Sequence, residues 1–313
     1  MKLFNFIVLI IINTSVVYGQ KNNWINFEWS GDSISGRYFE KSSIIVPIQI
    51  DNLPYKFSAQ LDLGAVNTML YGNSIEPYLN QHNSLKSKID TNAIIWVQSQ
   101  KNPTIKNVNL KIDNTIFNKI DIALFKNYGD SLTFDSIKSN TIKHIGTIAP
   151  DIFQNKIVII DYPNHRLCAL DRLPIDLEKQ CSFTNFIINE GRIKIPFNIN
   201  GKVKNLLFDT GSSLFSIYTS QKNMNDISNP NSPICDSLKI SSWGEYYFAY
   251  GKKIEVDIKF VNKILPAKIA FFDKKDDFDV FLDNEKIWGI TGNDYFVDNI
   301  LVIDYKNKRI GLK

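Results

Sequence analysis

Two Asp-x-Gly segments carry the residue types best suited to chemistry in this 313-residue sequence. Asp209-Thr210-Gly211-Ser212 follows the apolar run 206–208, and Asp62-Leu63-Gly64 follows the strand-like segment 55–61. An apolar strand can carry a carboxylate into a dry interior, where its burial is costly unless the group is satisfied. Two carboxylates in contact cannot both ionise easily, so they hold one shared proton and can act as acid and base. We therefore predict that Asp62 and Asp209 form a catalytic pair.

Other catalytic chemistries find little support in the sequence. The histidines and cysteines are scattered and never at metal-ligand spacing, and no Gly-rich phosphate loop or Gly-x-Ser-x-Gly motif is present. No histidine is placed in the sequence to activate Ser212 or Ser213. The acidic segment 273–279 lacks the spacing and glycine of a calcium loop, and its interleaved lysines predict a solvated loop. The sequence predicts neither a metal nor a cofactor.

The surroundings of the two Asp-x-Gly segments repeat along the chain. Trp96 lies 34 residues after Asp62, and Trp243 lies 34 residues after Asp209. Gly146 is echoed by Gly289, and the closing segment 160–167 is echoed by 303–310 at the same offset of 143 residues. A chance tripeptide would not bring ordered landmarks with it, so the chain is an internal duplication.

The elements that must position the carboxylates are strands. Alternating or β-rich segments joined by polar turns fill both halves, and a long helical periodicity is missing. Hairpins are predicted at 44–61 and 193–208, each leading into an Asp-x-Gly segment, and residues 72–85 have room for a short helix. The predicted halves are residues 20–172 and 173–313, with the boundary in the polar segment 173–180.

Over about residues 43–313 this order of landmarks resembles the bilobal pepsin-like aspartic proteases, and its Asp-Thr-Gly is shared with retropepsin-like relatives. The resemblance implies an all-β fold of two pseudo-twofold related lobes with a cleft between them, which binds a polypeptide substrate. It implies that Asp62 and Asp209 activate a water molecule without a cofactor. The supporting residues that match the family motif are Gly64, Thr210, Gly211, Ser212, Gly146 and Gly289.

The first half departs from that family. Leu63 stands where the family has Thr, and Ala65 cannot hydrogen-bond its Asp as Ser212 can, so we expect Asp209 to be the more acidic partner. His144 and Ala149 replace an apolar residue and a common glycine of the supporting segment. These departures leave two hypotheses open, an aspartic endopeptidase or a weak or inactive relative that binds peptides or an envelope partner.

The family's flap, a hairpin that follows the first catalytic loop, usually carries a Tyr. Here Trp96 and the polar tip around Gln98 lie at that distance, and both are candidate substrate-binding residues. Trp96 and Trp243 are equally interpretable as core aromatics.

Residues 1–19 have the layout of a secretory signal peptide, with Lys2 before a short apolar run, although an uncleaved anchor is the alternative. We therefore expect a secreted or periplasmic monomer with no membrane span after signal removal. The net charge of +4 without a basic run argues against a nucleic-acid partner. Export permits disulfides, and Cys181 with Cys235 is the preferred pair, whereas Cys168 is interpreted as a buried small hydrophobe.

Overall fold

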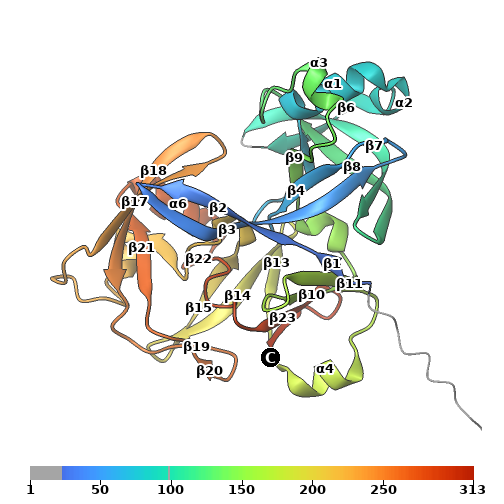
Figure 1. Cartoon of the computed structure of the whole chain (residues 1–313). Helices are drawn as coiled ribbons and strands as arrows, with labels where there is room; N and C mark the ends of the chain where they lie inside the picture. Colours follow the sequence, from blue (N-terminus) through green and yellow to red (C-terminus); the bar gives the residue numbers. More distant parts are fainter. Residues whose placement is uncertain (1–22, 98) are drawn as a thin grey trace, which may run out of the picture.

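The computed structural model describes residues 23–97 and 99–313, so the predicted signal peptide at 1–19 and Gln98 lie outside the described residues. Lobe one is built on an eight-stranded sheet with the order β2-β3-β4-β9-β5-β8-β7-β6 (Figure 1). Its strands are β2 (Glu28–Ile34), β3 (Arg37–Ile50), β4 (Phe57–Leu61), β5 (Met69–Tyr71), β6 (Ile89–Val97), β7 (Gln100–Ile112), β8 (Thr115–Phe125) and β9 (Lys143–Ile148). Its helices are α1 (Gly72–Gln81), α2 (Asn83–Lys86), α3 (Phe134–Ile137) and the 3-10 turn η1 (Pro150–Phe153). The hairpin predicted at 44–61 and the helix predicted within 72–85 are both confirmed.

Lobe two repeats this arrangement in a ten-stranded sheet, in which β13 pairs with β14 beside the path β17-β18-β21-β16-β22-β15-β14-β19-β20. Its strands are β13 (Ile187–Asn189), β14 (Arg192–Ile199), β15 (Lys202–Phe208), β16 (Tyr218–Ser220), β17 (Asp236–Ser242), β18 (Glu245–Lys253), β19 (Ile258–Phe260), β20 (Lys263–Ile264), β21 (Ile269–Asp273) and β22 (Gly289–Thr291). Its helices are η2 (Thr210–Ser212), α5 (Gln221–Met224) and α6 (Asp276–Glu285). The pairing of β14 with β15 around Asn200-Gly201 confirms the second predicted hairpin.

A six-stranded sheet joins the lobes, with the order β1-β11-β10-β23-β24-β12. Its strands are β1 (Ile25–Asn26), β10 (Ile157–Asp161), β11 (Arg166–Leu170), β12 (Ser182–Asn185), β23 (Ile300–Asp304) and β24 (Arg309–Leu312), and α4 (Ile175–Gln180) lies between β11 and β12. The closing strands of the two halves, β10 and β23, pair directly and antiparallel. The same sheet therefore contains the closing strands of both repeats.

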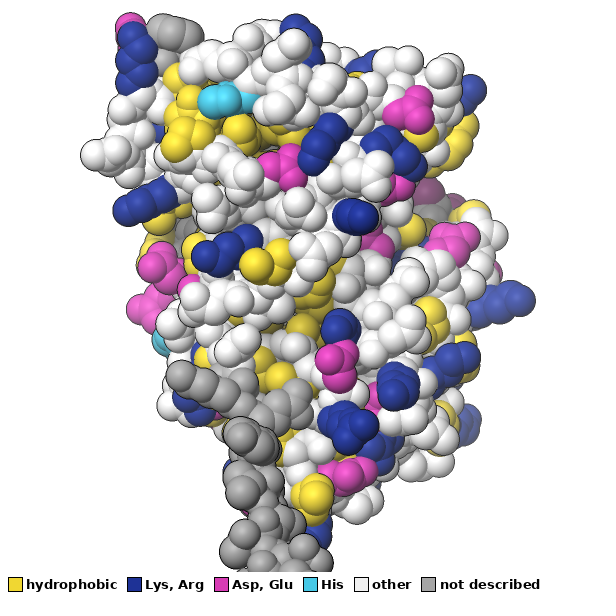
Figure 2. Space-filling view, turned by 90° about the vertical axis from the view of Figure 1, so that its right-hand side faces the viewer, with side chains coloured by type: hydrophobic (Ala, Val, Ile, Leu, Met, Phe, Trp, Pro, Cys, Tyr) yellow, Lys and Arg dark blue, Asp and Glu magenta, His cyan; other side chains and the backbone are white. Residues whose placement is uncertain are grey.

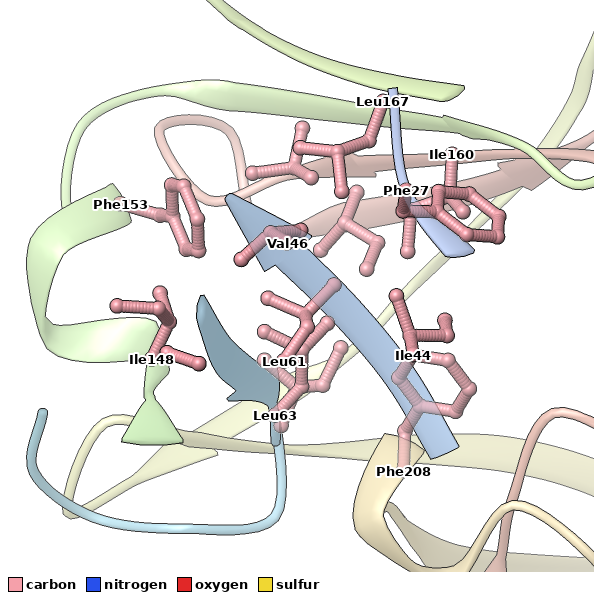
Figure 3. Close-up of a cluster of buried hydrophobic side chains, with 14 of the residues drawn as sticks. Phe27, Ile44, Val46, Leu61, Leu63, Ile148, Phe153, Ile160, Leu167 and Phe208 are labelled. Atoms are coloured by element: carbon pink, nitrogen blue, oxygen red, sulfur yellow. The ribbon is translucent and has the colours of Figure 1, made fainter. Parts of the chain in front are cut away.

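The hydrophobic core runs through both lobes. The cluster in Figure 3 brings Leu61 of β4 and Leu63 of the Asp62 loop together with Phe208 of β15. Ile160 of the joining sheet belongs to the same cluster. The strand that precedes each Asp is thus anchored in shared apolar packing. On the surface, the face in Figure 2 carries Lys and Arg interspersed with Asp and Glu, in keeping with the small net charge.

Two sequence-based expectations are wrong. All three cysteines are free, and the predicted Cys181–Cys235 pair is not formed, because Cys181 packs beside the joining sheet while Cys235 precedes β17 in lobe two. Cys168 is buried, as expected. The segment 273–279 is not a solvated loop, because the helix α6 begins at Asp276. Acidic side chains in its first turn complement the positive end of the helix dipole, and Phe278 packs on the core of lobe two.

Candidate active site

The two Asp-x-Gly loops have equivalent positions in the two lobes. β4 runs parallel to β9, and β15 runs parallel to β22, so the strand that precedes each Asp lies beside a supporting strand. The N–H of Asp62 donates to the carbonyl of Ile148 at 2.9 Å, and the N–H of Asp209 donates to the carbonyl of Thr291 at 2.9 Å. Each Asp therefore leaves its strand at a point fixed by the neighbouring strand.

The supporting residues lie where the repeat puts them. Gly146 pairs with Ala59 of β4, and Gly289 pairs with Leu206 of β15. Ala149, the departure from the family pattern at the end of β9, is fully buried and donates its N–H to the Thr68 hydroxyl at 3.0 Å. The lobe-one segment is therefore closed by a side-chain hydrogen bond.

Both carboxylates accept hydrogen bonds from their own loops, but not equally. Oδ1 of Asp62 accepts from the N–H groups of Gly64 and Ala65, both at 3.0 Å. Oδ1 of Asp209 accepts from Gly211 at 2.8 Å and from Ser212 at 3.2 Å, and its Oδ2 accepts from the Ser212 hydroxyl at 2.7 Å. Three donors at Asp209 against two at Asp62 favour the negative charge on Asp209.

The two carboxylates face each other across the boundary between the lobes. A Cβ atom at Gly64 would lie 2.2 Å from Cγ of Asp209, and a Cβ atom at Gly211 would lie 2.8 Å from Cγ of Asp62. Because such distances exclude any side chain, glycine is required at both positions for the loops to approach this closely. The Asp residues predicted to pair are brought together.

The environment of Asp62 keeps a proton on the pair. Burial, and then the charge of Asp209 and a hydrogen bond with it, raise the pKa of Asp62 well above its usual range. Asp62 itself is buried at 8% exposure. A carboxyl group that keeps its proton next to a second carboxyl group is an arrangement suited to acid–base chemistry.

Thr210 joins the two loops through its side chain. Its hydroxyl donates to the carbonyl of Leu61 at 2.7 Å and accepts from the N–H of Leu63 at 2.9 Å. Leu63, which replaces the expected Thr of lobe one, is fully buried in the hydrophobic cluster of Figure 3. One hydroxyl therefore spans the lobe boundary where a symmetric site would use two.

A cleft of about 1230 Å³ opens on the pair and is lined by Asp62 and Asp209 together with Gly64, Gly211 and Ser212. Much of its apolar wall comes from lobe two, through Leu207, Phe215, Tyr218, Phe278, Phe281 and Ile290. Tyr71 and Tyr128 of lobe one, which the sequence did not single out, also line it. Within residues 23–97 and 99–313, no cluster of three or more His, Cys, Asp or Glu side chains could hold a metal ion.

The two repeated tryptophans differ in their surroundings. Trp96 is 58% exposed, lies outside the cleft lining and faces the Lys101 ammonium at 5.3 Å, so it is neither a core aromatic nor a wall of this cleft. Trp243 does line the cleft. The repeat is the sequence signal that points to Trp243, because Trp243 and Trp96 have the same spacing from their Asp residues.

Comparison with known proteins gives a relationship at the level of the fold. No family model and no curated protein matches this sequence. Among solved structures, the aspartic proteinase from Irpex lacteus matches with a TM-score of 0.51 and 11% identity, over 92% of this chain and 96% of that one. The likeness is one of fold. The protein has an all-β fold of two lobes, similar to that of the Irpex lacteus aspartic proteinase.

Proposed function

We propose that the protein is an aspartic endopeptidase that hydrolyses peptide bonds with a water molecule activated by Asp62 and Asp209. The observation that carries the proposal is the contact between one carboxyl group whose pKa is strongly raised and a second carboxylate held by three donors. A structural ion-pair network would not leave such a pair lining a cleft large enough for a peptide.

The proposed reaction needs only these two side chains and water. Asp209 takes a proton from the water as its oxygen attacks the scissile carbonyl carbon, and Asp62 gives its proton to the carbonyl oxygen. The product of this step is a neutral tetrahedral diol, and the proton has moved from Asp62 to Asp209. In the second step Asp209 protonates the departing nitrogen, the C–N bond breaks, and a diol hydroxyl returns its proton to Asp62.

We also propose that the protein is exported through residues 1–19 and acts as a secreted or periplasmic monomer. In the described part of the chain, the structure has no helix that is long and apolar enough to cross a membrane. The proposal on export rests on the charged, apolar and small-residue order of the first nineteen residues.

A second function, peptide binding without efficient cleavage, is favoured by the weaker first loop, in which Leu63 and Ala65 supply no hydroxyl. The rate of cleavage of an unfolded protein substrate distinguishes the two functions. It is compared for wild type, Asp62→Asn, Asp209→Asn and Asp176→Asn, which changes an exposed residue and serves as the control. An endopeptidase loses about a hundredfold or more of its rate in the first two variants, because each removes a proton-transfer group, and keeps its rate in the control.

Cleavage by Asp209→Asn equal to that of wild type would overturn the proposed mechanism. Tight binding of a statine-type peptide, which mimics the tetrahedral diol, supports the enzyme. An intact fold that binds an ordinary peptide but neither binds the statine peptide nor cleaves would identify the binding protein instead.

A further inference from the structure

The lobe-two hairpin, formed by β17 and β18, reaches lobe one at its tip. The ring centroid of Trp243 lies 5.7 Å from that of Tyr128 and 6.0 Å from that of Phe125, and both partners belong to lobe one. Trp243, Tyr246 and Tyr247 all line the cleft. The hairpin therefore bridges the space above the catalytic pair.

In lobe one, the tip of the β17–β18 hairpin contacts an aromatic cluster next to Asp62. Tyr128 stacks on Phe125 at 4.7 Å and meets the edge of Tyr71 at 4.8 Å. Ala65, in the Asp62 loop, belongs to the same hydrophobic cluster, against which Trp243 packs. The contact between the lobes is thus made beside the reacting groups.

The turn that contains Trp243 requires a positive φ at this position, which bulky residues disfavour. Trp243 and Gly244 have φ values of 51° and 90°, and the ordinary hairpin turn Asn200-Gly201 has 48° and 79°. Asn and Gly are the preferred residues for this two-residue turn, whereas a bulky residue at positive φ is an outlier that marks strain or function. Trp243 occupies the place where the chain elsewhere uses Asn.

The base of the lobe-two hairpin is held by polar bonds to the N-terminal hairpin, formed by β2 and β3. The Lys239 N–H donates to the Ser35 hydroxyl at 2.8 Å, and Arg37 pairs with Asp236 at 2.7 Å. The tip, by contrast, meets lobe one through the aromatic contacts of Trp243. Aromatic contacts of this kind are individually weak, so the tip can open and close.

We propose that the lobe-two hairpin covers a polypeptide in the cleft, and that Trp243 is the positioning residue that latches it over the bound chain against Tyr128 and Phe125. The covering role rests on the proposed peptidase function. The proposal assigns the cover to lobe two, because Trp243 lines the cleft whereas Trp96, on the hairpin of β6 and β7, is exposed and is not part of the lining.

Trp243→Asn tests the latch in the free protein, because Asn suits the turn and keeps the hairpin folded while removing the ring. The readout is hydrogen exchange of the backbone amides at residues 126–130 of lobe one. A change in the stability of the Trp243 turn, which lies in lobe two, would not by itself alter exchange at these residues. We expect exchange there to rise about three- to tenfold, as loss of the aromatic contact implies, and to stay unchanged in the matched control Trp96→Asn. Equal exchange in wild type and Trp243→Asn would overturn the latch.

Peptide hydrolysis tests the covering role. In Trp243→Asn we expect KM for a peptide to rise about tenfold with the pH profile unchanged, because the catalytic pair is intact, and we expect Trp96→Asn to stay within about twofold of wild type. A raised KM in Trp96→Asn with none in Trp243→Asn would overturn the assignment while leaving the peptidase proposal standing. If wild type neither cleaves nor binds a statine-type peptide, the proposed function and the covering role both fail, and the exchange experiment still decides the latch.

Discussion

At the scale of single residues, the site depends on one hydroxyl that serves both halves of the molecule. Thr210 satisfies the buried carbonyl of Leu61 and the buried N–H of Leu63, across the boundary between the lobes. Because Leu63 offers no hydroxyl in return, the two Asp-x-Gly loops are joined from one side only. Because of this asymmetry, the connection between the two loops depends largely on Thr210.

Replacing Thr210 by Val keeps the shape of the side chain and removes both hydrogen bonds. We expect the free energy of unfolding to fall by about 2–4 kcal/mol, because two buried backbone groups lose their partner. Thr210→Ser, which keeps the hydroxyl, should cost less than about 1 kcal/mol. Denaturant titration measures both, and equal losses in the two variants would show that packing matters here and the hydroxyl does not.

Asp151 is a partly buried carboxyl group, away from Asp62 and Asp209, that should affect stability through pH. It accepts hydrogen bonds from the N–H of Thr68 at 2.8 Å and from the Thr68 hydroxyl at 2.6 Å, and burial nevertheless raises its pKa to about 6. Between about pH 4 and pH 6 the folded protein therefore keeps a proton that the unfolded chain has lost. The contribution of Asp151 to the free energy of unfolding falls as pH rises through this window, by at most about 3 kcal/mol.

Asp151→Asn removes the titrating group and should flatten this part of the stability profile. The measurement is the difference in unfolding free energy between wild type and variant from pH 4 to pH 7.5. We expect the unfolding free energy of the variant, relative to that of wild type, to increase with pH up to about pH 6 and to stay constant at higher pH. Parallel profiles over the whole range would show that Asp151 titrates alike in the folded and unfolded chain.

At the scale of elements, the N-terminal hairpin ties lobe one to lobe two beside the cleft. Its base pairs within the lobe-one sheet, and its tip packs Ile34 and Phe39 on the core of lobe two. Midway, the Ser213 hydroxyl, just after the second catalytic loop, donates to the carbonyl of Lys41 at 2.7 Å. This hairpin therefore helps to fix the distance between the lobes.

The ion pair at its tip is the polar part of this connection. Arg37→Glu should destabilise the protein by up to about 1 kcal/mol, and adding Asp236→Arg should restore most of that loss, because the pair is partly exposed and screened by water. The coupling from a double-mutant cycle should fade at 1 M salt. A coupling that persists at high salt would mean that the contact does not act through charge.

The elements that the sequence predicted are those whose information is local. Alternation identified the hairpins before each Asp, and the repeat identified the closing strands, now seen as β10 and β23. The N-terminal hairpin was not predicted although its Ser35-Gly36 turn is local. Its contact with lobe two could not be predicted, because Ser35 meets Lys239, which is far away in the sequence. The helix α6 was missed because its charges resemble those of a solvated loop, whereas Phe278 packs inward.

At the scale of the whole molecule, the duplication is visible in the chemistry of the joining sheet. Arg166 pairs with the buried Asp161 at 2.9 Å, and Arg309 pairs with the buried Asp304 at the same distance. With β10 and β23 directly paired, the repeated halves meet around an approximate twofold axis that also brings the two Asp-x-Gly loops together. The approach of Asp62 to Asp209 could be predicted because both follow this repeat. The different positions of Trp243 and Trp96 relative to the cleft could not, because the two residues occupy equivalent places in the sequence and different places in the fold.

The most direct test of the central claim, that Asp62 holds the proton of a working pair, is the pH dependence of kcat/KM for a peptide substrate. We expect kcat/KM to fall as pH rises through the raised pKa of Asp62, because the acid then loses the proton that it must donate. We also expect Asp62→Asn and Asp209→Asn to have almost no activity at any pH. A value of kcat/KM that stays constant from acid to alkaline pH, or that survives in either variant, would contradict it.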